Sequence, residues 1–220
     1  MNIKAVIFDM DGLLINSEPL WWEAEIETAK MVGLNLDKTQ VLETTGLRVD
    51  KIVDHWFHKK PWTKPPRKEV EDALVADLIS RVKARGAEMP GARQVLEMVK
   101  KKNVKMALAS SSLMTIIDAA TKKLGIRKYF DELYSAEFEE HGKPHPGVYM
   151  TVAKMLDVAP EQCLALEDSF NGVLAAKAAR MKCVCVPEKD HLKNPKLAIA
   201  DFVLPSLLDF KEESWEKLAL

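Results

Sequence analysis

Short apolar runs that alternate with helical patterns constrain the fold of this chain more than any other feature. Between the runs, apolar residues repeat at helical spacing, as in Ala92, Leu96 and Val99. Continuous apolar runs of this kind are typical of strands that are covered on both faces. We therefore predict an α/β fold, a Rossmann-like parallel sheet with helices on both faces. The expected strands lie at residues 4–8, 104–109, 132–134, 164–166 and 182–186, with a further short one at 202–204.

The connection between the first two strands is far longer than a single crossover helix requires. It carries helical faces of its own and four of the five tryptophans. Ser17 suits the N-cap of its first helix, and Pro19 suits the first turn. We expect residues 17–86 to form an all-helical cap domain, inserted into an α/β core made of residues 1–16 and 87–220.

The composition excludes several classes of function. The 220 residues carry 32 basic and 33 acidic side chains, a net charge of −1, so the basic field that nucleic-acid binding requires is lacking. No apolar run approaches the ~20 residues that span a bilayer, and the N-terminus lacks the apolar region of a signal peptide. The three cysteines are interpreted as buried, reduced thiols. We expect a cytoplasmic monomer without nucleic-acid or membrane partners.

Two aspartates, Asp9 and Asp11, follow the first apolar run. Parallel sheets bind their ligands at the carboxyl ends of the strands, and two buried negative charges there require a cation or a proton to offset them. A turn needs only one such acceptor, so the pair followed by Gly12 favours a catalytic site over a structural turn. One carboxylate would attack phosphorus and form an aspartyl-phosphate. The other would act as acid and then as base.

Two further signals suit an anion. Ser110 and Ser111 follow the second run, and hydroxyls with free N–H groups at a helix N-terminus bind anions, although an ordinary helix cap is the alternative. Lys143 lies just before Pro144 in a rigid loop that suits a point charge held against phosphate. A solvated loop lysine is the alternative for that position.

The run at 164–166 is followed by Glu167 and Asp168, which would either cap the next helix or provide oxygen ligands to a hard cation such as Mg²⁺. His141 and His145 are interpreted as loop residues, because Pro144 interrupts any helix that would align them as metal ligands. All these signals fall at one edge of the predicted sheet. Phosphoryl transfer needs this set of carboxylates, cation, hydroxyls and lysine.

These motifs resemble those of the haloacid dehalogenase superfamily over essentially the whole chain. The four motifs of the superfamily correspond here to Asp9-x-Asp11-Gly12, Ser110, Lys143 and Glu167-Asp168. Residues 9–21 are very like the corresponding run of its sugar-phosphate phosphatase branch, and the helical insert looks like its C1 cap. The resemblance implies a sheet order of 5-4-1-2-3.

The resemblance also implies a role for each position around the metal. Asp9 would be the nucleophile and a ligand of Mg²⁺. Asp11 would be the acid and base, with its backbone carbonyl on the metal. Asp168 would complete the metal site, with Glu167 close by as a ligand or through water.

A second group of roles concerns the substrate. Ser110 and the N–H of Ser111 would hold the transferring phosphoryl group, and Lys143 would bridge Asp9 and the phosphate. Met10 is placed with these substrate-binding residues. Arg48 lies in the loop of the cap that would contact the sugar.

The activity implied is Mg²⁺-dependent hydrolysis of small sugar or polyol phosphates, such as hexitol phosphates or 2-deoxyglucose 6-phosphate. A β-phosphoglucomutase-type mutase and a phospho-accepting, receiver-like switch domain are the alternatives. Relatives usually carry Asp where Asn16 stands at the cap hinge, a departure that we expect not to abolish the chemistry.

Overall fold

The computed structural model describes residues 2–219, in which six parallel strands form one sheet. Their order is β3-β2-β1-β4-β5-β6, which is the predicted order with β6 added beyond β5, so the α/β prediction is confirmed. Phe8 pairs with Leu108 on one side and with Leu166 on the other, so the ends of the three central strands lie level. The strands are β1 (Ala5–Phe8), β2 (Lys105–Ser110), β3 (Glu132–Ser135), β4 (Cys163–Glu167), β5 (Lys182–Cys185) and β6 (Phe202–Val203).

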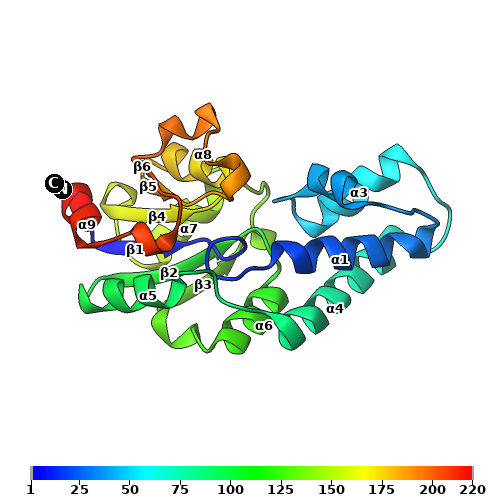
Figure 1. The fold of residues 1–220 in the computed structure, drawn as a ribbon, viewed down its shortest axis with the longest axis horizontal. Helices are drawn as coiled ribbons and strands as arrows, with labels where there is room; N and C mark the ends of the chain where they lie inside the picture. The colour runs from blue at the N-terminus through cyan, green and yellow to red at the C-terminus, as the bar shows by residue number, and fades with distance from the viewer. Residues whose placement is uncertain (1, 220) are drawn as a thin grey trace.

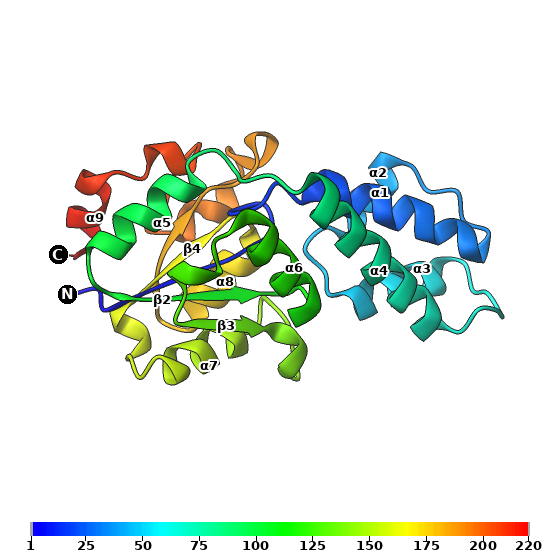
Figure 2. The same cartoon turned by 90° about the horizontal axis from the view of Figure 1, so that it is seen from below.

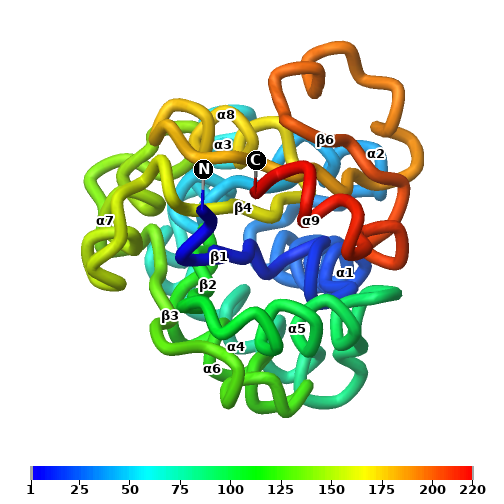
Figure 3. The backbone as a smooth tube through the Cα atoms, turned by 90° about the vertical axis from the view of Figure 1, so that its left-hand side faces the viewer, coloured from blue at the N-terminus to red at the C-terminus, as the bar shows by residue number. Residues whose placement is uncertain are grey.

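Helices cover both faces of the sheet (Figures 1 and 3). Because successive side chains of a strand point to opposite faces, Val6 and Phe8 pack in one apolar core, and Ala5 and Ile7 pack in the other. The first core is covered by α5 (Ala92–Lys101), α6 (Met114–Leu124) and α9 (Glu212–Ala219), and the second by α7 (Gly147–Met155) and α8 (Phe170–Ala178).

The segment between β1 and α5 is helical, as predicted, and extends beyond the carboxyl ends of the strands (Figures 1 and 2). It contains α1 (Glu18–Ala29), α2 (Lys38–Val41), α3 (Val49–Lys59) and α4 (Arg67–Arg85). In α4, Val70, Leu74, Leu78 and Val82 recur at helical spacing and are buried, which fixes this helix against α1 and α3. We call residues 17–86 of this segment the insert.

Short 3₁₀ helices connect many of these elements. They are η1 (Lys30–Val32), η2 (Leu42–Thr44), η3 (Arg127–Tyr129), η4 (Ala136–Phe138), η5 (Pro160–Gln162), η6 (Lys189–His191), η7 (Pro195–Ile199) and η8 (Leu207–Asp209). Both termini lie at the end of the molecule opposite the insert (Figure 2).

The two chain segments that join the insert to the sheet are hydrogen-bonded to each other. Ile15 forms an antiparallel bridge with Glu88. The N–H of Asn16 donates to the Ala87 carbonyl at 2.9 Å, and the N–H of Met89 donates to the Leu14 carbonyl at 3.0 Å. The outgoing and returning chain therefore form one paired strip.

The cysteines are as predicted, since Cys163, Cys183 and Cys185 are all free and buried. Within the part of the chain that the structure describes, we find no helix with the length and apolar character needed to cross a bilayer.

Candidate active site

The carboxyl ends of the central strands open into a cavity of about 400 Å³. The level ends of β1, β2 and β4 bring together residues that are far apart in the sequence. The cavity is lined by most of the predicted site residues, namely Asp9, Asp11, Ser110, Ser111, Lys143 and Asp168, and by side chains of the insert. The predicted convergence at one edge of the sheet is therefore present.

Lys143 lies at the centre of the polar contacts. Its ammonium donates to Asp9 Oδ1 and to Glu167 Oε1, both at 2.6 Å, and to the Ala109 carbonyl at 3.2 Å. The Tyr149 ring lies beneath it, 5.0 Å from Nζ to the centroid, and the Tyr149 hydroxyl donates to Glu167. Burial lowers the pKa of Lys143, but Asp9 and Glu167 raise it by more, so the side chain stays charged. It is a fixed cation, unlike the solvated loop lysine of the alternative interpretation.

Three carboxylates form an acidic cluster beside this lysine. Asp9, Glu167 and Asp168 each offer an oxygen, and these oxygens lie within 4.8 Å of one another. Burial raises the pKa of Asp9 to about 8; Lys143 counteracts this increase, whereas Glu167 and Asp11 add to it. Burial also raises the pKa of Asp168. Ionising all three acids beside one ammonium requires a further positive charge, and these carboxylate oxygens fit a hard divalent cation.

Two glycines make room for the acids. A Cβ on Gly12 would lie 2.2 Å from Asp168 Oδ2, and Gly12 also adopts a positive φ of 72°. A Cβ on Gly172 would lie 2.0 Å from the Glu167 carboxyl carbon. Ser169 caps α8 by accepting a hydrogen bond from the Gly172 N–H at 3.1 Å, so Asp168 is not needed as the cap.

Asp11 is held by hydroxyls and an indole, apart from the acidic cluster. Its Oδ1 accepts from Ser17 Oγ at 2.7 Å and from Trp21 Nε1 at 3.1 Å. Its Oδ2 accepts from Ser112 Oγ at 2.7 Å and from Ser110 Oγ at 3.3 Å. The insert and the sheet thus both contact this carboxylate. Ser17 stands at the predicted N-cap position of α1, but its side chain makes no cap hydrogen bond because it bonds to Asp11.

Two predicted substrate-binding side chains point elsewhere. Met10 is buried in the core of the protein. The Arg48 guanidinium donates to the carbonyls of Ala136 and Glu139, at 3.3 and 3.2 Å, and so joins the insert to the loop that precedes Lys143. Among the described residues of its loop, Gly46 and Leu47 line the cavity and Arg48 does not. Contact between Arg48 and substrate stays a prediction.

The sequence interpretation placed the loop around Arg48 at the substrate but did not identify several other side chains of the cavity wall. Trp21, Trp22, Glu25 and Thr44 line the cavity, as do residues between Pro187 and Leu197 of the core. One signal for Glu25 was available in the sequence. It lies on the buried face of α1, beside residues spaced four apart (Leu20, Ala24 and Thr28), where a carboxylate is unusual.

Comparison with known proteins defines the class of protein. The sequence model of one protein family, the haloacid dehalogenase-like hydrolases, matches residues 3–180 of the chain. The chain belongs to this family, which confirms the resemblance inferred from the motifs and the prediction of a hydrolase.

Individual relatives are similar over nearly the whole length. The chain is 41% identical to hexitol phosphatase B of Escherichia coli (strain K12) over 209 residues, which cover 94% of each chain. CbbY from Rhodobacter sphaeroides in complex with phosphate superposes with a TM-score of 0.86 at 26% identity, covering 94% of this chain and 96% of that one. A β-phosphoglucomutase from Clostridium difficile superposes with a TM-score of 0.84 at 26% identity, covering 99% and 97%.

Proposed function

We propose that this protein hydrolyses small sugar or polyol phosphates, with hexitol and hexose phosphates as substrates, through an aspartyl-phosphate on Asp9 and with Mg²⁺ as cofactor. The observation that carries the proposal is the Lys143 ammonium bonded to Asp9 beside an acidic cluster, inside a cavity that the insert closes on one side. The 41% identity to a hexitol phosphatase supports the same substrate class.

The proposed cycle assigns one step to each side chain. Asp9 attacks phosphorus in line with the departing sugar oxygen, while Lys143 fixes the orientation of the Asp9 carboxylate. Asp11 gives its proton to the sugar oxygen and then takes a proton from the water that cleaves the aspartyl-phosphate. Ser110 and the N–H of Ser111 hold the phosphoryl oxygens. Mg²⁺, held by Asp9 and Asp168 with the Asp11 carbonyl, would balance the negative charge of the phosphoryl group.

A mutase is the second candidate, because the chain superposes closely on a β-phosphoglucomutase. A mutase would return the phosphoryl group from Asp9 to a sugar phosphate instead of to water. A receiver-like switch domain is disfavoured by membership of the hydrolase family and by the large cavity between insert and sheet.

Phosphate release across a panel of hexitol, hexose and pentose phosphates tests the proposal. We expect turnover with Mg²⁺ and loss of at least about 100-fold of it after removal of metal with EDTA, with recovery on adding Mg²⁺ back. Isomerised sugar phosphate without inorganic phosphate would establish the mutase instead. Labelling of the protein without turnover would establish the switch domain.

The Gly12→Ala variant is expected to lose Mg²⁺ affinity by at least about tenfold, because the new Cβ would displace the Asp168 carboxylate. Gly33→Ala is its matched control, since Gly33 has a φ of 73° and no atom within 4 Å of the added Cβ. Gly33→Ala should cost about 1 kcal/mol of stability through backbone strain and leave Mg²⁺ binding unchanged. Calorimetric titration measures both affinities, and equal affinities in the two variants would contradict this assignment of Asp168.

We further propose that residues 17–86 act as a separate cap domain and that the enzyme is a cytoplasmic monomer. The paired strip between insert and sheet supports the first proposal. The three buried, reduced thiols suit a reducing compartment.

A further inference from the structure

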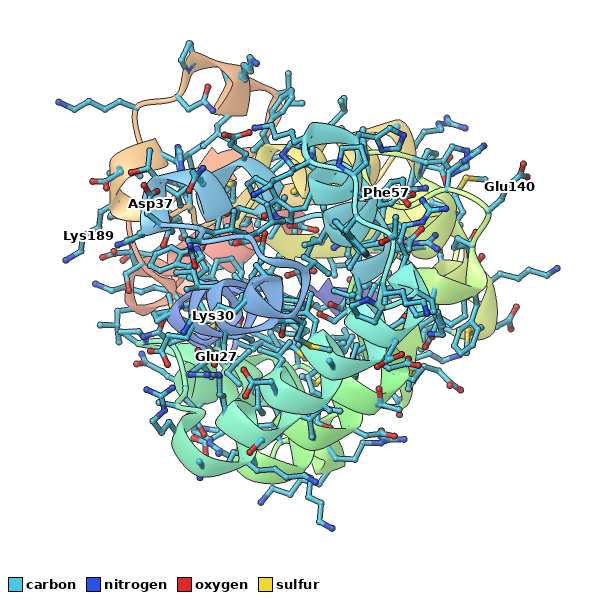
Figure 4. All side chains as sticks on the ribbon, turned by 90° about the vertical axis from the view of Figure 1, so that its right-hand side faces the viewer. Glu27, Lys30, Asp37, Phe57, Glu140 and Lys189 are labelled. Carbon is cyan, nitrogen blue, oxygen red and sulfur yellow. The ribbon has the colours of Figure 1, made fainter. Side chains whose placement is uncertain are left out.

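Glu25 of the insert is a buried acid for which the proposed catalytic cycle has no role. It lies on α1 and is 4% exposed. Glu27, two residues further along the same helix, is exposed and pairs with Lys30 at 2.5 Å on the outer surface of the insert (Figure 4). The two acids therefore differ in environment although they share a helix, and only Glu25 lines the cavity.

The hydrogen bonds around Glu25 require two protons where a threonine provides only one. Thr44 Oγ1 lies 2.8 Å from Glu25 Oε1, 2.9 Å from Glu25 Oε2 and 2.8 Å from the Val41 carbonyl oxygen. A hydroxyl carries a single hydrogen, so it cannot donate both to the carbonyl and to the carboxyl group. The indole N–H of Trp56 already donates to Oε1. An ionised Glu25 would leave two oxygens in contact without a hydrogen between them.

A neutral carboxylic acid supplies the second hydrogen that this set of contacts needs. With its proton on Oε2, Glu25 donates to Thr44 Oγ1, and the Thr44 hydroxyl is free to donate to the Val41 carbonyl. Oε1 then accepts from Trp56. Each oxygen of the set has a partner of the right kind, as buried polar groups require.

This chain of hydrogen bonds ends at the part of the insert that faces the phosphate site. Val41 and Thr44 lie in the segment 41–47, and residues 44–47 form a continuous stretch of the cavity wall. Thr44 is itself buried, and its hydroxyl is held between the Val41 carbonyl and the Glu25 carboxyl group. Glu25 is therefore linked to this wall through the hydroxyl of Thr44.

We propose that Glu25 is a positioning residue which, as a neutral carboxylic acid, fixes segment 41–47 through Thr44 and thereby shapes the sugar end of the cavity. The proposal rests on the proposed hydrolysis of sugar phosphates, which it deepens by assigning a determinant of substrate affinity.

The surroundings of Glu25 favour the neutral form. Burial raises its pKa to about 7, and the hydrogen bonds from Trp56 and Thr44 oppose that rise only in part. The elements packed against α1 carry charged groups that pair elsewhere. Glu43 of η2 pairs with His55 and Lys59 of α3, and Arg81 and Arg85 of α4 pair with Glu23 of α1. Glu18 of α1 lines the same cavity, and α4 contributes apolar side chains such as Leu74.

Four variants and a control separate positioning from catalysis. Glu25→Ala and Thr44→Val break the hydrogen-bond chain and are expected to raise KM for a hexitol phosphate by about tenfold. Acetyl phosphate has no sugar to contact the wall, so its kcat/KM should change by less than about twofold. Glu25→Gln and Thr44→Ser can remake the same hydrogen bonds and should restore KM to within about threefold. Glu27→Gln is the control on the outer face of α1.

The protonation state is tested independently of any substrate. Because the folded pKa is about 7 and the ordinary value is 4.5, the folded state keeps a proton that the unfolded state has lost. The stabilising contribution of Glu25 should therefore fall as pH rises from about 4.5 to 7 and then stay low. Glu25→Gln carries no such proton, so its melting temperature relative to wild type should rise by about 5 °C between pH 5 and pH 8. Glu27→Gln should show no such rise.

The possible failures are distinguishable. If wild type hydrolyses acetyl phosphate but no sugar phosphate, the proposed function fails, and the melting temperatures still test the neutral acid. If sugar phosphates are hydrolysed but Glu25→Ala leaves KM unchanged, the positioning role is overturned. The neutral acid is overturned if the difference in melting temperature between Glu25→Gln and wild type is the same at every pH. It is also overturned if Glu25→Gln raises KM as much as Glu25→Ala does.

Discussion

The Asp9→Asn variant is expected to fold normally and to lose phosphate release by at least about 10⁴-fold. An amide does not form the acyl phosphate, whereas its oxygen can still accept the hydrogen bond from Lys143. Removing one of three crowded carboxylates also relieves repulsion within the acidic cluster, so stability should not decrease. Steady-state phosphate release and urea unfolding measure the two effects.

Asp118→Asn provides the matched control for that variant. Asp118 is exposed on α6 and is not among the described residues that line the cavity. It undergoes the same chemical change, and its turnover should remain within about twofold of wild type. Substantial Mg²⁺-dependent turnover in Asp9→Asn would rule out covalent catalysis by Asp9.

The Lys143→Met variant is expected to lose both activity and stability. In the wild-type protein, the Lys143 Nζ makes ion pairs at 2.6 Å with Asp9 and with Glu167, whose side chain is fully buried. Removing the ammonium leaves a buried carboxylate without its cation, which costs about 3–5 kcal/mol. Turnover should fall by about 10³-fold, because this lysine both stabilises negative charge on the phosphoryl group and orients the Asp9 carboxylate. Urea unfolding at pH 7 and phosphate release measure these losses.

The double variant Lys143→Met/Glu167→Gln separates the two roles of the lysine. Neutralising Glu167 removes most of the uncompensated charge, so stability should recover by about 2 kcal/mol relative to Lys143→Met. Activity should not recover, because Asp9 still lacks its cation. Recovery of both, or of neither, would show that the stabilising and catalytic roles of Lys143 have been assigned wrongly.

The fold was predictable because its signals are local. Strand residues covered on both faces are continuously apolar, so runs such as 4–8 were visible without knowledge of their neighbours. The site followed from the same rule, since parallel strands end at one edge and carry Asp9, Ser110 and Asp168 there. The short edge strand β6, which pairs with β5, was also visible as an apolar run at 202–204.

The contacts between insert and sheet could not be predicted in this way. They depend on how the insert packs against the sheet and its loops, and the local spacing of residues carries no information about that packing. Ser17 suits an N-cap by residue type, yet its hydroxyl bonds to Asp11 because the start of α1 lies directly over that carboxylate. Arg48 similarly reaches main-chain carbonyls at 136 and 139, some 88 and 91 positions away in the chain.

The paired strip formed by residues 14–16 and 87–89 restricts how the insert can be displaced. Two independent tethers would permit translation as well as rotation in any direction. Two chain segments bonded edge to edge resist shear and stretching, because either motion strains both main-chain hydrogen bonds at once. A swing about an axis at the strip would keep these bonds, and in such a swing the rim of the cavity farthest from the axis would travel the greatest distance.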